Sequence, residues 1–504
     1  MENLNENNKV PAADKYAGAV ITWLLVPLLS AVFISLTYNS NVWLDEAFTA
    51  SLVRTDMAGV ISRSMQDTLP PLYNIILKLT TDAFGYTIPV MKLTSVVPMI
   101  LTLILGASVV RKRFGAPTAC IFMLAVTVMP QMLFFGLEIR MYSLGFLFAT
   151  ASAVFAYEII CKPCKINWCL FTLSSVLAGY SHHFAFVTVG FIYLFLLIYA
   201  CMGLKKNDEN TDKDTPEDLD AEKPDLKQEE HPVKIKDFLI CLLATFILYL
   251  PCLLVTIKQF LSVSGYFSMP EITMSVFIKY CRYPYTVGLT ILSALLITLC
   301  GFLLMRTFIR KEKTIHDVYP LYCFAVFYLV LLFGTAISKV MTANIFVDRY
   351  LFFSLGLIWF FFAVEAGKLK KIFIYFIILF EITVGIFSYV QAFSSEYAPG
   401  SDETIRWLKQ NVSPGDSLYT LEEYEELAYC LTFYDPNLKN FETLDGAAEG
   451  AGDNNIWLAV LEGYDKTDEY NGYMDEIDEK GYSREYVGAF RFDRYMFRMY
   501  RLVK

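Results

Sequence analysis

The sequence predicts a polytopic α-helical membrane protein with a small α/β domain at its C-terminus. The chain of 504 residues is 55% hydrophobic and only 18% charged, whereas soluble proteins contain roughly 25% charged residues. Apolar runs long enough to cross a bilayer recur through the first three quarters of the chain. The last quarter alternates helix-like and strand-like patterns and is acidic. This combination excludes an ordinary soluble enzyme, a fibrous protein and a disulfide-bonded scaffold.

About eleven apolar runs are candidate membrane spans. The first run is too long for the apolar core of a signal peptide, and no small-residue cleavage site follows it, so we expect a retained span. The predicted spans lie near residues 17–38, 88–110, 116–136, 142–160, 167–181, 184–203, 237–257, 286–308, 317–338, 350–366 and 372–393.

The short loops predict the orientation, because cytoplasmic loops are enriched in lysine and arginine. With a cytoplasmic N-terminus, every strong basic cluster falls on the cytoplasmic side. These clusters are Arg111, Lys112 and Arg113; Lys162 and Lys165; Arg306, Arg310, Lys311 and Lys313; and Lys368, Lys370 and Lys371. The loop 39–87 and the C-terminal domain are then extracytoplasmic.

Charge is distributed unevenly along the chain. Of the net charge of −9, residues 205–236 carry −4 and residues 401–504 carry −11, which leaves +6 on the rest. The segment 205–236 is rich in Lys, Asp, Glu and Pro, which predicts a disordered cytoplasmic linker. A basic membrane body with two acidic appendages does not suggest a nucleic-acid partner.

Residues 394–504 are predicted to form a separate extracytoplasmic α/β domain after a transmembrane domain of residues 1–393. Its predicted elements are a helix over Asp402–Asn411 capped by Ser401, a strand over Ser417–Leu421, a helix over Glu422–Phe433, a strand over Asn455–Leu461, a helix over Asp468–Lys480 and a hairpin of Glu485–Phe492 with Tyr495–Val503. Its sequence contains no phosphate-binding loop, GxGxxG motif or nucleophile elbow. Chemistry is therefore expected in the transmembrane part.

Two adjacent carboxylates follow the first predicted span, in the sequence Trp43-Leu44-Asp45-Glu46. A pair of carboxylates at a partly dehydrated membrane surface could act as a general base and its electrostatic partner. The alternative is structural, because Asp45 could cap a helix over residues 46–64 and Glu46 would then lie in its first turn.

A proline pair follows further along the same loop, at Pro70 and Pro71. Proline suits the first turn of a helix, so the loop is predicted to contain two interfacial helices joined by a rigid corner. The second of these helices covers Leu72–Thr81. Asp67 lies at the corner, as a cap or as a further polar group facing the same site.

A third polar group, Glu138-Ile139-Arg140-Met141-Tyr142, separates the third and fourth predicted spans. Glu138 and Tyr142 are four residues apart and share a helix face if the helix continues through them. Arg140 could hold a phosphate or pair with an acid, and a structural ion pair is an equal competitor.

Two of the four histidines, His182 and His183, lie together at the predicted outer face. They could bind a metal, but adjacent histidines on a helix point in different directions. The alternative is a hydrogen-bonding pair at the interface.

The tenth predicted span begins with Asp348-Arg349-Tyr350. The N-terminus of a helix is unfavourable for a cation, so Arg349 needs an anion, either Asp348 or a ligand phosphate. Its guanidinium matches the geometry of phosphate oxygens. Carboxylates and arginines at one interface suit a substrate with a phosphate head and a lipid tail.

Taken in order, these motifs resemble those of the GT-C glycosyltransferases. The motifs are W-x-D-E at 43–46, D-x-x-P-P-L-Y at 67–73 and E-x-R-M-Y at 138–142. They are most similar to the bacterial branch related to protein O-mannosyltransferases (glycosyltransferase family 39), the aminoarabinose lipid A transferases and the galacturonosyl core transferases. The resemblance covers residues 17–393 and is most specific over 40–145. The segments around His182 and Arg349 also look like family positions.

The resemblance implies an enzyme in a bacterial plasma membrane, a hexosyl- or pentosyltransferase that uses a sugar carried on polyprenyl phosphate. Asp45 would be the general base that activates an acceptor hydroxyl on a glycan, a glycolipid or a protein, and the reaction would invert the anomeric carbon. Glu46 would act beside Asp45 in catalysis. The residues implied to contact substrate are Asp67, Glu138, Arg140, Tyr142, His182, Arg349 and Tyr350, of which the two arginines would stabilise the leaving phosphate.

One position departs from the family pattern. Many relatives have D-x-H-P-P at the loop corner, and here the third position is Leu69. A histidine that could bind a metal or the acceptor is therefore missing. If the enzyme uses a divalent cation, His182 is the remaining candidate ligand for it.

Two other classes of function compete with the enzyme. A transporter or flippase of lipid-linked sugars would not need Asp45 as a base, and a binding or assembly protein would act through its outer domain. The order of motifs on one side of the membrane favours the glycosyltransferase.

Overall fold

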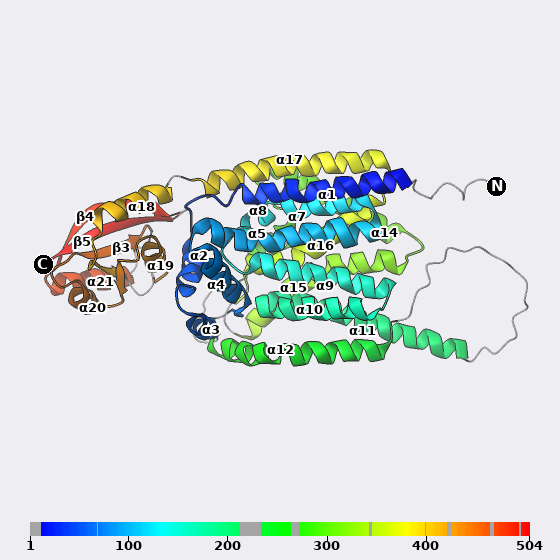
Figure 1. Ribbon diagram of the computed structural model, residues 1–504, viewed down its shortest axis with the longest axis horizontal. Helices are drawn as coiled ribbons and strands as arrows, with labels where there is room; N and C mark the ends of the chain where they lie inside the picture. The colour runs from blue at the N-terminus through cyan, green and yellow to red at the C-terminus, as the bar shows by residue number, and fades with distance from the viewer. Residues whose placement is uncertain are drawn as a thin grey trace, which may run out of the picture.

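The structure is a computed structural model that describes residues 12–67, 69–211, 233–263, 272–341, 345–398, 400–420, 425–463, 468–492 and 495–504. Long helices run side by side along its longest axis, and a small α/β domain lies beyond one end of this bundle (Figure 1). We call this end the domain end. The short helices α2, α3 and α4 lie between the bundle and the C-terminal domain.

Among the described residues, the bundle contains eight helical segments that are long and apolar enough to cross a membrane. They are α5 with η1 (Gly106–Val110) and α6 (Arg111–Phe114), together Ile88–Phe114; α9, Tyr142–Cys161; α11, His183–Thr211; α12, Ile235–Val263; α14, Thr290–Ile309; α15, Ile315–Val340; η3 (Asp348–Leu351) with α16 (Phe352–Gly367); and α17, Lys371–Glu396. Four further helices pack among them, namely α1 (Ala12–Ile34), α7 (Ala116–Val128), α8 (Pro130–Phe135) and α10 (Lys165–Ser181). The chain is a multi-pass membrane protein, whereas the predicted total of eleven spans is not confirmed.

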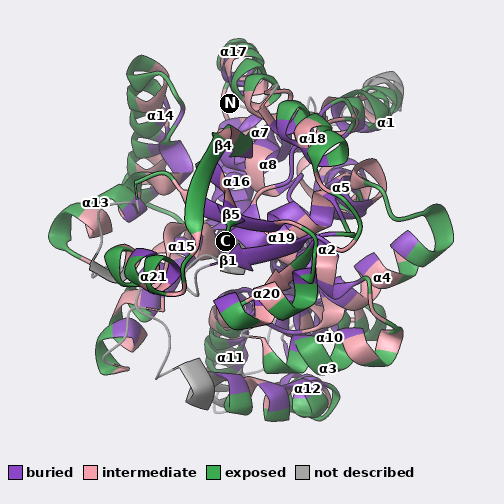
Figure 2. Cartoon of the chain, turned by 90° about the vertical axis from the view of Figure 1, so that its left-hand side faces the viewer, coloured by how far each residue is buried: buried purple, intermediate pink, exposed green. Residues whose placement is uncertain are grey.

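Helix α16 occupies the centre of the bundle and packs against α7, α9 and α15. Every residue from Phe352 to Ala366 is buried, which agrees with the purple colour of α16 near the middle of Figure 2. Its sequence is apolar on all faces apart from Ser354 and Glu365, and a helix of that kind must be buried. The turn that precedes it, η3, is thereby placed at the centre of the domain end.

The basic clusters of the short loops gather at the opposite end of the bundle. Arg113 forms an ion pair with Glu158 there. Glu365, which has no exposed surface, lies 2.5 Å from Lys368 and 3.3 Å from Arg310. The pairs Arg113–Glu158 and Arg310–Glu365 join helices that are distant in the sequence. They place the clusters identified from the sequence on one side of the bundle.

Three short helices cover the domain end: α2 (Leu44–Leu52), α3 (Met57–Gln66) and α4 (Leu72–Phe84). The single helix predicted over residues 46–64 is wrong. The Asp56 side chain accepts a hydrogen bond of 2.8 Å from the Gly59 N–H and so caps a new helix. The predicted proline corner is confirmed, since it separates α3 from α4. A further short helix, α13 (Met274–Arg282), continues into the 3₁₀ turn η2 (Tyr283–Tyr285).

The described residues of the C-terminal domain form a five-stranded sheet in the order β2-β1-β3-β5-β4. Strand β1 is parallel to β2 and β3, while β5 is antiparallel to β3 and β4. Its elements are α18 (Gly400–Asn411), β1 (Ser417–Thr420), α19 (Glu425–Tyr434), β2 (Lys439–Phe441), α20 (Leu444–Ala451), β3 (Ile456–Leu461), α21 (Asp468–Glu479), β4 (Ser483–Phe492) and β5 (Tyr495–Val503). The sequence missed β2, which is only three residues long, and α20, whose glycine-rich sequence is typical of a loop.

The predicted linker 205–236 is only partly described. Helix α11 continues to Thr211, so residues 205–211 are helical rather than disordered. Helix α12 begins at Ile235. Residues 212–232 lie outside the described residues.

Candidate active site

Asp45 lies in the first turn of α2 with its carboxylate between two arginines. Arg349 donates a hydrogen bond from Nη1 to Asp45 Oδ2 over 2.9 Å. Arg140 Nη2 lies 3.9 Å from the same oxygen, and its Nη1 donates to Thr49 Oγ1 over 2.9 Å. The structure thus brings together a carboxylate and two guanidinium groups that come from three separate predicted motifs. Both arginines are partly shielded, with side-chain exposures of 11% for Arg140 and 23% for Arg349.

The counter-ion of Arg349 is Asp45 rather than its neighbour Asp348. Asp348 Oδ2 lies 3.6 Å from Nζ of Lys279 on α13. A 3₁₀ turn has three residues per turn, so consecutive side chains on η3 point about 120° apart. Of the two anions proposed for Arg349 from the sequence, Asp348 is therefore excluded.

Glu46 is buried and connects α2 to the loop between α8 and α9. Its Oε1 accepts a hydrogen bond of 2.8 Å from the Ile139 N–H, and its Oε2 accepts one of 3.1 Å from the Trp43 N–H. Burial raises the pKa of Glu46 from its ordinary value to about 7, against the opposing effect of the nearby Lys92. The capping alternative for Asp45 is wrong, because the N-cap position of α2 is Trp43 and Asp45 lies inside the helix. The Glu46 side chain accepts the hydrogen bond from the N–H of this N-cap residue.

Glu138 lies in a non-helical segment, because α9 begins only at Tyr142. The helix does not continue through Glu138 and Tyr142, so the condition for a shared helix face is not met, although both side chains are buried at the same end of the bundle. Neither carboxylate oxygen of Glu138 has a hydrogen-bond partner among the described residues. Burial raises the pKa of Glu138 well above its ordinary range, and the neighbouring Glu46 and Asp45 raise it further. A neutral Glu138 presents an O–H donor.

His182 connects α10 to α11 and is buried beneath η3. Its Nδ1 accepts a hydrogen bond of 3.0 Å from the Phe184 N–H, so the neutral ring carries its proton on Nε2. Burial lowers the pKa of His182 well below its ordinary value, which keeps the ring neutral. The ring centroid lies 4.8 Å from that of Tyr350 and 4.4 Å from that of Phe353. In the described part of the chain, no three His, Cys, Asp or Glu side chains are grouped to hold a metal ion.

Several buried polar atoms around this site have no hydrogen-bond partner within the described ranges. Each would cost about 1–3 kcal/mol if it stayed unpaired, so their gathering at one place indicates a ligand site. The atoms are the two carboxylate oxygens of Glu138, Nε of Arg140, the hydroxyl of Tyr142, Nε2 of His182, the hydroxyl of Tyr283 and Nε of Arg349.

Tyr283 was missed from the sequence. It lies in η2, and its ionisation responds electrostatically to Tyr142 and Glu138. Burial raises the pKa of the Tyr283 hydroxyl well above its ordinary range, so it stays protonated. The sequence Tyr283-Pro284-Tyr285 after a basic amphipathic segment was the available signal.

Asp67 lies at the edge of the same site. It directly follows α3, and its carboxylate acts electrostatically on Arg140. Leu69, which replaces the family histidine, is buried, and its carbonyl accepts a hydrogen bond of 3.1 Å from Gln259 Nε2 of α12. The corner is thus held by the bundle itself.

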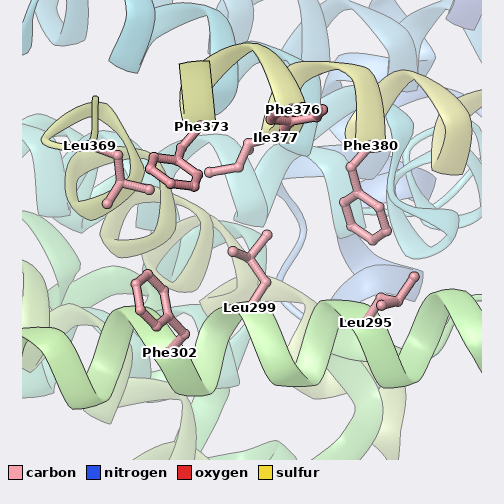
Figure 3. A pocket seen from close by; sticks show the side chains of 8 residues that line it. All are labelled: Leu295, Leu299, Phe302, Leu369, Phe373, Phe376, Ile377 and Phe380. Carbon is pink, nitrogen blue, oxygen red and sulfur yellow. The ribbon is translucent and has the colours of Figure 1, made fainter. Parts of the chain in front are cut away.

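An apolar groove lies elsewhere, between α14 and α17 (Figure 3). It encloses about 340 Å³ and is lined by Leu295, Leu299, Phe302, Leu369, Phe373, Phe376, Ile377 and Phe380. Leu369 follows α16, whereas Arg349 precedes it. The groove therefore begins at the end of α16 opposite to Arg349. Its lining side chains are all apolar and offer no group for catalysis.

Comparisons with known proteins identify the fold. No family model matches the chain, and no curated protein matches it either. Among solved structures, ArnT from Cupriavidus metallidurans bound to undecaprenyl phosphate is similar with a TM-score of 0.60 and 10% identity, over 95% of this chain and 97% of that one. The same protein in the apo state gives a TM-score of 0.61 at 10% identity, over 96% and 98% of the two chains. The chain therefore has the GT-C membrane fold of ArnT, as its ordered motifs predicted.

Proposed function

We propose that the protein is a membrane glycosyltransferase that moves a sugar from polyprenyl phosphate to an acceptor hydroxyl. The observation that carries this proposal is the Asp45 carboxylate held against Arg349 and Arg140 at one end of the bundle. Support comes from the likeness in fold to ArnT, whose structure contains undecaprenyl phosphate. The gathered polar atoms without partners support a ligand at this position.

Arg349 has two roles in this proposal. Without substrate its guanidinium is paired with Asp45. The donor phosphate is also an anion with oxygens suited to the guanidinium fork, so it competes with Asp45 for Arg349. Binding of the donor would then free the Asp45 carboxylate at the moment when a base is needed.

The reaction follows from these positions. Asp45 takes the proton of the acceptor hydroxyl, and the acceptor oxygen forms a bond to the anomeric carbon. The bond between the anomeric carbon and the phosphate oxygen breaks, and polyprenyl phosphate leaves with the electron pair. Attack from the face opposite the phosphate inverts the anomeric carbon. Arg349 and Arg140 stabilise the charge that develops on the leaving phosphate.

The neutral groups around the arginines serve as hydrogen-bond donors. Glu138, Tyr142, Tyr283 and the Nε2–H of His182 are buried and protonated, so they can bind phosphate or sugar oxygens without adding negative charge. The ring of Tyr350 contacts both His182 and Arg349 and so helps to hold these donors in place.

The site faces the extracytoplasmic side in this proposal. The basic clusters lie at the end of the bundle away from Asp45, and cytoplasmic loops are the ones enriched in lysine and arginine. The exposed apolar side chains Leu79 and Phe84 of α4 would contact the bilayer surface, where a lipid-linked donor enters.

The test uses purified protein in lipid with polyprenyl phosphates that carry mannose, galacturonic acid or aminoarabinose, together with glycan, glycolipid and protein preparations that supply the acceptor hydroxyl. Release of free polyprenyl phosphate is measured for the wild type, for Asp45→Asn and for the matched control Asp82→Asn. Asp82 is an exposed aspartate on α4 that pairs only with Lys78 among the described residues. We expect release from at least one donor in the wild type and the control, and none in Asp45→Asn.

Two outcomes contradict the proposal. Full release in Asp45→Asn would exclude Asp45 as the base. Movement of lipid-linked sugar across the bilayer without any release of polyprenyl phosphate would identify a flippase instead.

A further inference from the structure

The C-terminal domain docks directly on the chain segment that carries Asp45. Helix α19 of the domain packs on α2, and the two lie side by side in Figures 1 and 2. Phe48 of α2 meets Tyr429 of α19 edge to face, with ring centroids 5.2 Å apart. The domain therefore contacts the helix with the candidate base.

Tyr434, the last residue of α19, binds the backbone of the segment that precedes α2. Its hydroxyl donates a hydrogen bond of 2.6 Å to the Ser40 carbonyl and accepts one of 3.1 Å from the Val42 N–H. The tyrosine ring stacks on Phe492 of β4, with centroids 5.3 Å apart and planes inclined by 15°. Phe492 is fully buried in the domain, so the sheet fixes the direction of the hydroxyl.

Arg54 holds the other end of α2. Its guanidinium donates from Nη1 to the Thr432 carbonyl over 3.0 Å and from Nη2 to the Phe433 carbonyl over 2.8 Å. These carbonyls belong to the last turn of α19, where a cation is favourable. The guanidinium also lies over the Phe433 ring, 5.6 Å from its centroid. Both ends of α2 are thus held by one turn of one helix.

A third contact joins the same segment to the end of α17, where the domain begins. Asn41 is buried, and its Nδ2 lies 2.7 Å from the Glu396 carbonyl and 3.2 Å from those of Ser395 and Ala398. The Asn39 side chain also donates to Glu396 Oε2 over 2.9 Å. The approach to Asp45 is therefore bonded to the domain and to its connecting helix.

We propose that the C-terminal domain is a positioning element for the general base and that Tyr434 is its principal positioning residue. Helix α2 has only nine residues, and a helix of that length is marginal without tertiary contacts. Asp45 is three residues from Val42, whose N–H Tyr434 holds. A misplacement of about 1 Å at a reacting group can lower the rate about a hundredfold. This inference rests on the proposed glycosyltransferase function.

The test compares Tyr434→Phe with Tyr486→Phe in the full-length protein in lipid. The first change removes the two hydrogen bonds and keeps the stacked ring, whereas Tyr486 is exposed on β4, away from α2. We expect kcat for the identified donor to fall about tenfold or more in Tyr434→Phe, with less than a twofold change in KM. Amide hydrogen exchange over residues 42–52 should become faster in Tyr434→Phe alone.

A second variant guards against a loss of folding. Arg54→Lys keeps the charge but cannot contact both carbonyls in the same fork, so it should also lower kcat and speed exchange in α2. A fall in the melting temperature with unchanged exchange over 42–52 in both variants would overturn the positioning role. So would a wild-type kcat in both variants.

The two hypotheses fail in different ways. If Asp45→Asn is inactive and Tyr434→Phe has the wild-type kcat, the domain does not position the base although the proposed function stands. If Asp45→Asn is fully active, Asp45 is not the base of the proposed reaction, and the exchange measurement alone decides whether Tyr434 positions α2. Unchanged exchange then overturns the positioning of α2 by Tyr434, and faster exchange supports it.

Discussion

Arg349 Nη1 donates to Asp45 Oδ2 across 2.9 Å, although the two residues are 304 positions apart in the chain. One belongs to the turn before the central helix α16 and the other to the short helix α2. The pair joins the most buried helix of the bundle to the segment beneath the C-terminal domain.

Arg349→Ala should weaken binding of polyprenyl phosphate more than Asp45→Asn does. A hydrogen bond to a charged group contributes about 1.5–3 kcal/mol, so the dissociation constant should rise about 10- to 100-fold. Binding can be measured by titrating undecaprenyl phosphate into the protein in detergent. Arg282→Ala, which removes an exposed arginine at the end of α13, is the matched control. Unchanged affinity in Arg349→Ala would remove the phosphate role from this residue.

Glu46→Gln should change how stability depends on pH. Because burial raises the pKa of Glu46 to about 7, the folded state favours the neutral carboxyl. That stabilisation is full below the unfolded pKa of 4.5 and is lost as pH rises towards 7, a difference of about 3 kcal/mol. The glutamine cannot ionise, so its melting temperature should lack this decline.

Glutamine also has only one acceptor oxygen for the two N–H groups that Glu46 satisfies. The variant should therefore be less stable than the wild type near pH 5, by about 1–3 kcal/mol. The difference should shrink or reverse near pH 8. Parallel melting curves of both proteins from pH 4.5 to 8 would contradict the burial of a titrating Glu46.

Glu138→Gln should retain activity within about tenfold, while Glu138→Leu should lose about a hundredfold through the loss of one positioned donor. The raised pKa of Glu138 makes the protonated carboxyl its working form, and glutamine also offers N–H donors. Initial rates of polyprenyl phosphate release measure both variants, with Glu403→Gln on α18 as the control at an exposed position. Equal loss in the glutamine and leucine variants would show that Glu138 acts as an anion instead.

Lys92→Met should destabilise the protein by about 3 kcal/mol, because it leaves Glu396 without its ion-pair partner in a largely buried place. The double variant Lys92→Met/Glu396→Gln should recover part of this loss. A double-mutant cycle on melting in detergent measures the coupling. Additive effects of the two changes would show that this pair does not join α5 to the end of α17.

The sequence predicted the larger features of the fold because they depend on local patterns. Apolar runs of membrane length placed the helices of the bundle, and the proline pair placed the corner between α3 and α4. Alternating patterns placed most of the C-terminal sheet. The short strand β2 and the glycine-rich helix α20 were not predicted. A strand of three residues and a run of small residues show too little hydrophobic periodicity to indicate an element.

The candidate site was found from the sequence as separate motifs, but its pairing was not. Asp45, Arg140 and Arg349 were identified one by one, and their order along the chain suggested the fold. The sequence was equally compatible with a pair between Arg349 and Asp348. In the structure, the 3₁₀ turn η3 directs Arg349 towards Asp45 and Asp348 towards Lys279. The burial of Glu138 and the place of Tyr283 depend on packing between helices.

The sequence by itself thus determined the apolar helices of the bundle and the polar motifs that lie between them, because hydrophobic length and helix-breaking residues act over a few turns of chain. Tertiary structure alone decided which of these groups meet. It set Arg349 against Asp45, buried Glu138, and brought Tyr434 to the backbone of Ser40 and Val42. An ion pair or hydrogen bond is selected by distances of a few ångströms, and those distances follow from how helices far apart in the chain pack together.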